Sequence, residues 1–402
     1  MNNKIYLVNP CEKNILENAG DRIPIGLLSI AANIRKKGYD VKVYDLNHIN
    51  NDIFYSDFLN NKPSVVGIST YVSSNFNESI NIAKKLKNKT KLITGGYHAT
   101  AMPETLTPYF DSVVKGEGEN SFIKAINNNG IIEYEIPNLK EIPIPATDLL
   151  DMNKYGINQS GKRTGTLITS RGCPYSCAFC GNMEKIVRYE PINKVKAQIN
   201  QLINNGFKSI YFLDDVFTLK KQRMKEIVEY VKMNNLPFRV TTRANLIDES
   251  KLEILSKNGC EWLSMGIESG NDRILKNINK GMTIKDNKNA IELANQYGIK
   301  VKGFFVLGLP GETEQTARDT INFSTYLKSK GLVNADFYFL SPFPGTPIWN
   351  NPELFGIEIT DKDYTKYLQA GKTAHCYINT EELKASRIEE LVSEAKERWK
   401  KE

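Results

Sequence analysis

The residues of this chain best suited to chemistry are three cysteines in one short segment, Arg171–Cys180. Cys173, Cys177 and Cys180 have CxxxCxxC spacing and follow an apolar, strand-like run at 166–169. Three such thiolates can ligate three irons of a four-iron, four-sulfur cluster, which leaves the fourth iron free to bind another molecule. A structural zinc site takes four ligands, and no fourth Cys or His lies nearby in the sequence. The spacing therefore favours the cluster, with zinc or a disulfide as alternatives.

The other three cysteines give no sign of a second cluster. Cys11, Cys260 and Cys376 are isolated and far apart in the sequence, whereas a cluster site normally shows a close-spaced pair. We interpret them as ordinary packed or loop thiols.

Alternating strand and helix patterns after residue 163 predict the elements that position the cysteine loop. The expected strands are Gly165–Thr169, Ser209–Leu213, Phe238–Thr242, Trp262–Gly266, Lys300–Val306 and Ala335–Leu340. Helical patterns between them include Asn193–Asn204, Lys220–Met233 and Thr313–Lys328. Six βα units predict a partial (βα)6 barrel over 163–370, and a charged helix, Glu381–Lys400, predicts a short C-terminal helical extension over 371–402.

Polar or Gly/Pro residues follow each expected barrel strand, where a parallel barrel places its active site. Asp214 and Asp215 end the second strand, and Arg243 follows the third. Glu268 follows the fourth strand, and Gly308 follows the fifth. Strand ends commonly carry such residues, but their coincidence around a cysteine loop favours a functional site.

The first 130 residues also alternate, which predicts a doubly wound, Rossmann-like parallel sheet. Its expected strands are Lys4–Asn9, Val41–Tyr44, Val65–Ser69, Lys91–Thr94 and Ser112–Lys115, and its expected helices include Ile25–Lys37 and Asn77–Leu86. Loops at the ends of these strands are where an open α/β sheet binds ligands. Residues 131–162 are richer in Pro and are interpreted as a linker.

Several of these motifs resemble those of the radical S-adenosylmethionine (SAM) superfamily. The matching segments are 169–180, 212–215, 266–270, 307–312 and 342–347. Segments 24–28, 67–70, 95–100 and 114–119 are similar to the cobalamin-binding domain fused to one branch of that superfamily. The resemblance covers nearly the whole chain. It implies a cobalamin-binding domain at 1–130 and a radical SAM barrel at 163–370, with a 4Fe-4S cluster, SAM and cobalamin as cofactors.

The resemblance assigns roles where the motifs coincide. Cys173, Cys177 and Cys180 would ligate the cluster, whose open iron would be chelated by the methionyl amine and carboxylate of SAM. The residues implied to bind SAM are Phe179 (adenine), Asp214 and Asp215 (amine), Arg243 (carboxylate), Glu268 and Ser269 (ribose), and Leu307 and Gly308 (adenosyl group).

For cobalamin, the resemblance implies three loops at strand ends. Their residues are Ser69, Thr70, Tyr71, Gly95, Gly96, Tyr97, His98, Gly116, Glu117 and Gly118. The Asp-x-His-x-x-Gly motif that supplies a lower cobalt ligand is absent, which does not exclude binding in this branch. His98 is either a cofactor contact or an ordinary loop histidine, and Tyr97 stands where relatives commonly carry proline.

The implied activity is methylation of an unactivated carbon through a 5′-deoxyadenosyl radical and methylcobalamin. A radical cyclase, a ring-contraction or other rearrangement enzyme, and a non-enzymatic iron–sulfur electron carrier are the alternatives. The expected partners are a small-molecule or peptide substrate and a one-electron reductant of flavodoxin or ferredoxin type. The net charge of +7 is spread without a dense basic block, so nucleic acid is not favoured. The chain shows no apolar run of 18 residues and no secretory signal, so we expect a cytoplasmic protein without a membrane span.

Overall fold

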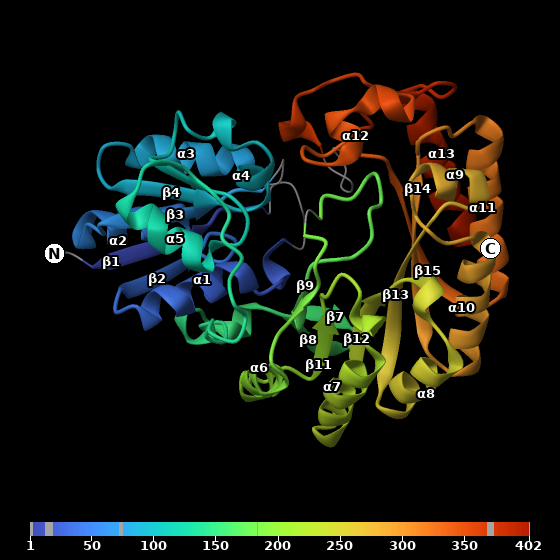
Figure 1. Ribbon diagram of the computed structural model, residues 1–402, viewed down its shortest axis with the longest axis horizontal. Coiled ribbons are helices and arrows are strands. Elements are labelled where there is room, and N and C mark those ends of the chain that lie inside the picture. Colours follow the sequence, from blue (N-terminus) through green and yellow to red (C-terminus); the bar gives the residue numbers. More distant parts are fainter. Residues whose placement is uncertain (1–2, 13–18, 72–74, 183, 368–373, 402) are drawn as a thin grey trace. The chain divides into compact units, whose positions relative to one another are not determined.

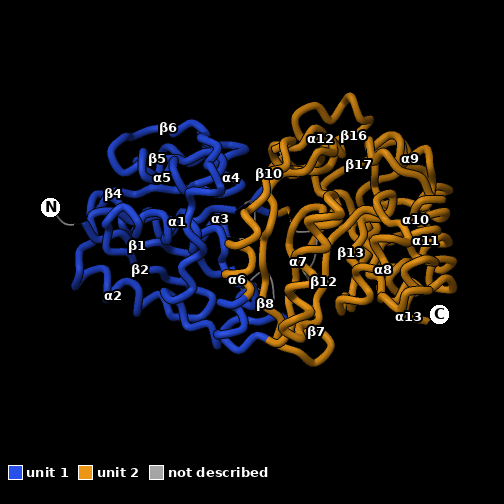
Figure 2. Tube along the Cα trace, turned by 60° about the horizontal axis from the view of Figure 1, so that its bottom comes forward, with its two compact units in different colours: residues 1–158, 200–207, 364–366 blue, residues 159–199, 208–363, 367–402 orange. Residues whose placement is uncertain are grey.

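The computed structural model describes residues 3–12, 19–71, 75–182, 184–367 and 374–401 (Figure 1). The chain divides into two compact units, which are coloured separately in Figure 2. Unit 1 comprises residues 1–158, 200–207 and 364–366, and unit 2 comprises residues 159–199, 208–363 and 367–402.

Unit 1 is built on a six-stranded parallel sheet, sheet A, with the strand order β2-β1-β3-β4-β5-β6. Its strands are β1 (Lys4–Asn9), β2 (Asp40–Asp45), β3 (Val65–Ser69), β4 (Lys91–Gly95), β5 (Ser112–Val114) and β6 (Gly130–Ile132). The helices are α1 (Ile25–Lys36), α2 (Asn51–Asn61), α3 (Phe76–Leu86), α4 (Tyr97–Ala101) and α5 (Gly118–Asn127). The strand order reverses direction between β1 and β3, so the predicted doubly wound fold is confirmed.

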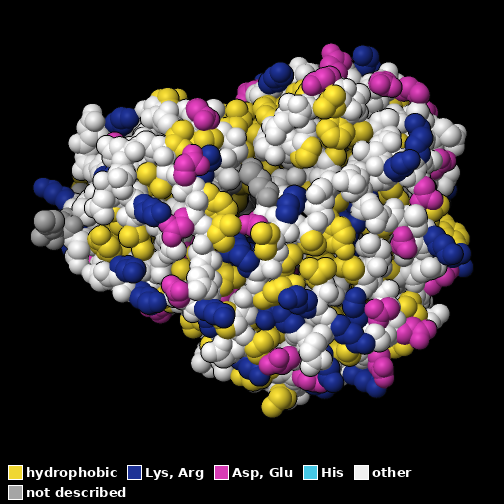
Figure 3. Space-filling view, viewed as in Figure 1, with side chains coloured by type: hydrophobic (Ala, Val, Ile, Leu, Met, Phe, Trp, Pro, Cys, Tyr) yellow, Lys and Arg dark blue, Asp and Glu magenta, His cyan; other side chains and the backbone are white. Residues whose placement is uncertain are grey.

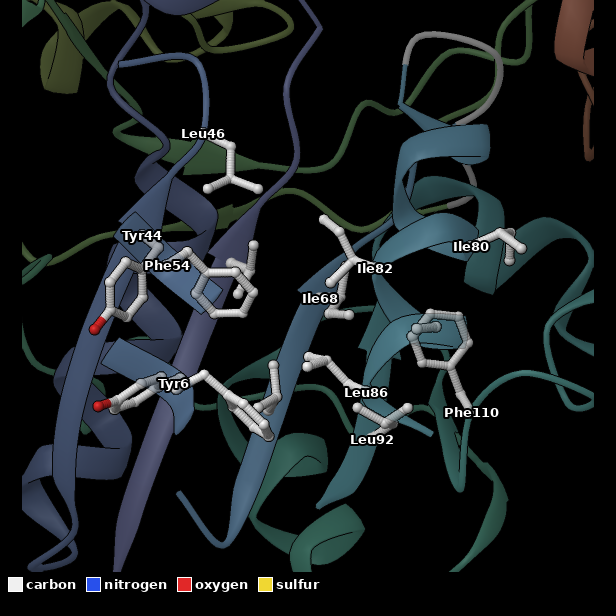
Figure 4. Close-up of a cluster of buried hydrophobic side chains, with 14 of the residues drawn as sticks. Tyr6, Tyr44, Leu46, Phe54, Ile68, Ile80, Ile82, Leu86, Leu92 and Phe110 are labelled. Carbon is white, nitrogen blue, oxygen red and sulfur yellow. The ribbon is translucent and has the colours of Figure 1, made fainter. Parts of the chain in front are cut away.

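Apolar strand residues explain why sheet A is buried on both faces. Ile5–Val8 of β1 are at most 1% exposed, as expected for a parallel strand covered by helices on both sides. Figure 4 shows one of the two layers, in which side chains of the strands meet those of α2 and α3. Phe54 of α2 lies fully buried there beside Tyr44 of β2, with ring centroids 5.2 Å apart. This packing fixes the C-terminal ends of the strands, and the loops predicted to bind cobalamin begin there.

Unit 2 contains sheet B, with the strand order β15-β14-β13-β12-β11-β8-β7. Its parallel strands are β8 (Lys162–Leu167), β11 (Ser209–Phe212), β12 (Phe238–Thr242), β13 (Cys260–Glu268), β14 (Lys300–Leu307) and β15 (Leu332–Phe339). They curl into the predicted partial barrel (Figure 1). The helices of the βα units are α6 (Ile192–Asn204), α7 (Lys221–Met233), α8 (Glu249–Lys257), α9 (Asp272–Asn277), α10 (Ile284–Gln296) and α11 (Glu314–Ser329).

Short elements complete unit 2 and were partly missed by the sequence patterns. β7 (Ile157–Gln159) adds an edge to sheet B, while β9 (Ser170–Arg171) and β10 (Arg188–Tyr189) form a small antiparallel ribbon. After β15 come α12 (Pro347–Asn350), the antiparallel pair β16 (Ile357–Ile359) and β17 (Ile378–Thr380), and α13 (Ala385–Lys401). The expected C-terminal helix is α13, and β17 precedes it.

The expected linker, 131–162, contains strand residues at both ends. β6 joins sheet A beside β5 with Gly130 opposite Ser112, and β7 joins sheet B. Both strands have three residues, which is too short for an alternating pattern to be recognised from sequence.

The surface and the helices agree with the composition. On the visible face in Figure 3, Lys and Arg side chains are interspersed with Asp and Glu over both units. Across the described parts of the chain, no helix has both the length and the apolar character that crossing a membrane requires.

Candidate cluster and cofactor sites

The cysteine loop is closed at its base by the β9–β10 ribbon, in which Arg171 lies opposite Arg188. Within the loop, the backbone amide of Cys173 donates to the carbonyl oxygen of Glu184 at 2.9 Å. Gly172 has a φ of +91°, and a Cβ there would lie 2.5 Å from the carbonyl oxygen of Ile186. Only glycine combines this conformation with such a close approach, so it lets the returning strand cover the loop.

All three loop thiols are free, and Cys177 is buried while Cys173 and Cys180 are half-exposed. Burial raises the pKa of the Cys173 and Cys180 thiols, and the nearby Asp215 carboxylate and neighbouring cysteines raise these pKa values further. These mutual effects show that the side chains lie close together, as the spacing predicted.

The donor set fits a cluster better than a single metal ion. Among the described residues, no three His, Cys, Asp or Glu side chains converge where one ion could bind. A structural zinc site needs such convergence, whereas thiolates that ligate different irons of a cluster do not share one metal. The loop therefore fits a 4Fe-4S cluster held by Cys173, Cys177 and Cys180.

Arg243, which follows β12, lies beside this loop as predicted. Its guanidinium carbon is 3.7 Å from the centre of the Tyr175 ring, and its Nη1 is 3.6 Å from Cys177 Sγ. Nη2 donates to the carbonyl oxygen of Lys280. The side chain is therefore held in place by stacking and hydrogen bonding next to a predicted cluster ligand, and carboxylate binding by Arg243 stays a prediction.

The two adjacent aspartates after β11 have different environments. Asp214 is buried, and its carboxylate accepts hydrogen bonds from the Thr169 amide (2.6 Å), the Thr169 hydroxyl (2.6 Å) and the Ser170 hydroxyl (2.5 Å). Burial raises the Asp214 pKa, although these hydrogen bonds oppose the shift. Asp215 is exposed and accepts a 2.7 Å hydrogen bond from the Asn182 amide.

These contacts revise one prediction. Asp214 fixes the backbone where the cysteine loop begins, so its carboxylate is not available to a ligand amine. Asp215 remains the candidate for that contact. The sequence could not separate the pair, because the strand-end position is shared and only burial distinguishes the two side chains.

Glu268 and Ser269, which are adjacent in sequence, also have different environments. Glu268 ends β13 and pairs with Lys280, with 2.7 Å between Glu268 Oε1 and Lys280 Nζ. Ser269 is fully buried, and its hydroxyl lies 3.1 Å from the hydroxyl of Thr320 on α11. The side chain of Ser269 therefore faces a helix, and its contact with a ribose stays a prediction.

A cavity of about 280 Å³ lies at the C-terminal ends of β13, β14 and β15. Its lining residues are Phe179, Glu268, Phe304, Val306, Tyr338, Leu340 and Ser341. Phe179 comes from the cysteine loop, so the cavity adjoins the predicted cluster. Its lining combines apolar side chains with the polar groups of Glu268, Tyr338 and Ser341, and small-molecule sites usually carry a few such polar groups.

Strand alternation separates the predicted residue Leu307 from the residues that line the cavity. Leu307 is fully buried, whereas Phe304 and Val306, with the opposite orientation along β14, line the cavity. Gly308 contributes its amide to the carboxylate of Glu312 and does not line the cavity. Leu307 and Gly308 thus support the end of β14 without lining the cavity, and their contact with an adenosyl group stays a prediction. The alternating pattern of β14 contained the signal for Phe304 and Val306.

The predicted cobalamin residues lie at the C-terminal ends of β3, β4 and β5, on one edge of sheet A. Ser69, Gly95 and Tyr97 are half-buried there, and Tyr71 is 47% exposed. Thr70 is buried, with its hydroxyl 2.7 Å from that of Thr94. This edge offers backbone groups and an exposed aromatic side chain.

Three glycines on this edge lie in close contact with other residues of the protein. Gly96 has a φ of +114°, and a Cβ there would lie 2.7 Å from the carbonyl oxygen of Thr70. A Cβ at Gly116 would lie 2.1 Å from the Tyr134 ring, and one at Gly118 would lie 2.4 Å from Ile30. Between the two, Glu117 lies 3.4 Å from the Tyr134 hydroxyl, which donates to its carboxylate. These glycines let the loops fold closely.

His98 is a core residue of unit 1. Its ring is fully buried, lies 4.7 Å from the Phe76 ring, and has Nε2 2.8 Å from the Thr105 hydroxyl. Burial lowers the His98 pKa to about 4, so the ring is neutral near pH 7. His98 is thus neither exposed nor in a loop: it lies in α4 (Tyr97–Ala101), and its contact with a cofactor stays a prediction. The edge therefore suits a cofactor that takes no cobalt ligand from this histidine.

Two protein-family models match the chain in agreement with this division. Residues 13–126 match the B12 binding domain, and residues 167–324 match the radical SAM superfamily. An uncharacterized methyltransferase of Pyrococcus horikoshii is 32% identical over 86% of this chain and 82% of its own length. The chain belongs to the cobalamin-binding radical SAM family. Membership implies a 4Fe-4S cluster and SAM in the barrel and cobalamin in the N-terminal domain.

Two further relatives show the range of the family. The anaerobic magnesium-protoporphyrin IX monomethyl ester cyclase of Rubrivivax gelatinosus is 26% identical over 87% of this chain and 69% of its own length. The radical SAM methyltransferase TsrM of Kitasatospora setae, solved with cobalamin and a 4Fe-4S cluster, superposes with a TM-score of 0.72 at 18% identity. It covers 89% of this chain and 77% of its own, and the likeness confirms the fold.

Proposed function

We propose that this radical SAM enzyme is a cobalamin-dependent methyltransferase that methylates an unactivated carbon of a small molecule or peptide. The observation that carries the proposal is a combination within one chain. Three free cysteines lie in a loop whose Phe179 lines a cavity, and the same chain contains a B12 binding domain. The most similar relatives described above include a methyltransferase at 32% identity. When bound, the cluster supplies the electron that cleaves SAM, and cobalamin supplies methyl-transfer chemistry.

The chain's own residues would bind and orient these groups. Cys173, Cys177 and Cys180 hold the cluster, while Arg243 faces the SAM carboxylate with a guanidinium fork suited to that group. Asp215 is the carboxylate available to the SAM amine.

The cavity that begins at Phe179 takes the adenosyl group, with Phe304 and Tyr338 as aromatic walls. Glu268 accepts hydrogen bonds from the ribose hydroxyls. Ser69, Tyr71, Gly95, Gly96 and Tyr97 contact cobalamin from the edge of sheet A.

The domain limits belong to the same proposal. We assign cobalamin binding to residues 1–130 and the radical SAM barrel to 163–370, joined by 131–162 and followed by 371–402. The family matches at 13–126 and 167–324 lie inside these limits. A flavodoxin- or ferredoxin-type protein would deliver the electrons, and an oxygen-labile cluster suits the cytoplasm.

The test is a product analysis. Anaerobically reconstituted protein would be incubated with cobalamin, a reductant, methyl-labelled SAM and candidate substrates. Label on a substrate carbon, with 5′-deoxyadenosine formed, is the expected result. Failure to bind cobalamin would instead indicate a cobalamin-independent radical enzyme.

A second candidate function is supported by the magnesium-protoporphyrin ester cyclase, which matches over 87% of this chain. A cyclase or rearrangement enzyme of this family would bind the same cofactors and form 5′-deoxyadenosine. Its product would carry no label from the SAM methyl group. The labelling experiment therefore separates the two functions.

A further inference from the structure

The backbone at Glu268 has an unusual conformation for a strand end beside a cavity. Glu268 has a φ of +64°, and the pairing of β13 with β14 shifts register between Gly266 and Glu268. A non-glycine residue in this region is strained, so its surroundings must hold it there. Bulges beside active sites commonly redirect a side chain. The side chain redirected here is the carboxylate on the cavity wall.

Gly266 makes room for that carboxylate. A Cβ at Gly266 would lie 2.2 Å from Glu268 Oε1 and 2.9 Å from Lys280 Nζ. The Glu268 side chain therefore folds back over its own strand and occupies the space that a side chain at 266 would need.

Lys280 is the partner that holds the carboxylate in this position. The Nζ–Oε1 distance is 2.7 Å, and the two side chains are only 6% and 8% exposed. Two buried charges are costly to desolvate, and removing one leaves the other without compensation. Oε1 is the oxygen that the ammonium contacts, so Oε2 is left to accept a hydrogen bond from a ligand in the cavity.

Lys280 is itself anchored to the cysteine loop. Its carbonyl oxygen accepts a hydrogen bond from Arg243, whose other terminal nitrogen lies 3.6 Å from Cys177 Sγ. The preceding residues bind the same loop, because Ile278 accepts from the Ala178 amide at 2.9 Å and Asn279 donates to a loop carbonyl at 3.0 Å. One short segment thus contacts both the cluster loop and the cavity wall.

We propose that Lys280 is a positioning residue for SAM binding. It holds the Glu268 carboxylate at the cavity wall and in a fixed position relative to the cluster loop. This inference rests on the proposed function, since it takes the ribose hydroxyls as the ligand of Glu268. Lys280 acts through Glu268 and does not itself contact the ribose. Its contribution to SAM affinity therefore depends on the carboxylate being present.

A double-mutant cycle tests this dependence. The proteins are the wild type, Lys280→Met, Glu268→Gln and the double variant, each reconstituted with its cluster. The readout is the SAM concentration that produces the change in the electron paramagnetic resonance spectrum of the reduced cluster. We expect Lys280→Met to raise the apparent Kd for SAM about tenfold when Glu268 is present and less than about threefold when Gln replaces it. Lys280→Arg, which keeps the charge, should recover most of the affinity.

Lys162→Met is the matched control, because Lys162 also forms a 2.7 Å ion pair with a β13 residue, Glu261. It should leave the apparent Kd unchanged. Iron content and the spectrum without SAM should be the same in all variants, which excludes general misfolding.

Equal effects of Lys280→Met with and without Glu268, or no effect at all, would overturn the inference. A wild type that holds the cluster but shows no response to SAM would contradict the proposed function instead.

Discussion

The C-terminal edges of sheet A and sheet B are built on opposite principles. At the edge of sheet B, Asp215 and Arg243 lie near the three free thiols, and Glu268 lines a cavity. At the edge of sheet A, glycines fold the loops tightly and the histidine is buried in the core. Both edges end parallel strands, so the strand topology alone does not create the difference.

The comparison predicts how each edge would recognise the cofactor that we propose for it. SAM is small and charged, and individual side chains at set positions can bind its amine, carboxylate and hydroxyls. Cobalamin is large, and a surface of backbone and small residues can cover one face of it without any single dominant contact. Substitutions at the edge of sheet B should therefore have large, residue-specific effects, and those at the edge of sheet A should act through loop shape.

The largest expected effect is on the cluster. Replacing Cys173, Cys177 and Cys180 with Ala together should abolish iron binding and 5′-deoxyadenosine formation, because the described residues include no group of His, Cys, Asp or Glu side chains that could hold a metal in their place. Iron analysis and product chromatography measure both. Cys260→Ala is the control: this thiol is buried at the start of β13, and its loss should leave the cluster intact. A cluster that still forms without the three cysteines would contradict their role as ligands, and with it the contrast drawn between the two sheet edges.

The next effect concerns the adjacent aspartates. Asp214→Ala should lower stability by about 3 kcal/mol, because it leaves the buried donors of Thr169 and Ser170 without their acceptor. Asp215→Ala, at an exposed position, should change stability by less than about 0.5 kcal/mol but weaken SAM binding. Thermal unfolding and SAM titration give the two readouts. If the variants were equally stable, Asp214 would not have the structural role assigned to it.

For sheet A, Gly96→Ala should cost about 2 kcal/mol, because it combines a positive φ with a contact 2.7 Å from the Thr70 carbonyl oxygen. It should also weaken cobalamin binding by displacing the Thr70 loop. Gly38→Ala is the matched control, since Gly38 has a φ of +89° but nothing within 4 Å of the added Cβ. Cobalamin titration followed by absorbance compares them. Equal affinities in the two variants would argue against recognition through loop shape.

The last two predictions concern the pH dependence of stability, and the two units should respond in opposite directions. In unit 2, burial raises the Glu312 pKa from 4.5 to about 8. Between these values the folded protein keeps a proton that the unfolded chain has lost. Stability from this group therefore falls as pH rises, by about 1.4 kcal/mol per unit at most. Glu312→Gln should remove that slope in unfolding experiments between pH 5 and 8.

In unit 1, burial lowers the His98 pKa from 6.5 to about 4. Its contribution to stability is present above pH 6.5 and is lost as pH falls toward 4, because only the unfolded chain takes up the proton. His98→Gln should flatten this acid limb, and the cob(II)alamin spectrum should stay unchanged. A spectrum altered by His98→Gln would mean that this histidine reaches the cofactor.

The sequence alone determined the fold, and it predicts the cluster ligands. The bounds of β1, β3 and β12 coincide with the predicted strands, because an apolar run in β1 and β3 and an alternating pattern in β12 can be recognised locally. The cysteine spacing is equally local, since all three thiols lie within eight residues of one loop. The resemblance of the motifs to a known family predicted the three cofactors.

Only the tertiary structure decided which side chains of the predicted set face a ligand. Asp214 and Asp215 are neighbours in sequence, and long-range packing buries one and exposes the other. Phe304 and Val306 line the cavity and Leu307 does not, because the direction of each side chain on β14 depends on which face of the sheet meets the helices. Lys280 carried no motif that singled it out, since its role comes from a contact with Glu268 and another with Arg243, 37 residues away. Local spacing sets which groups a loop contains, but burial and distant partners set where each group points.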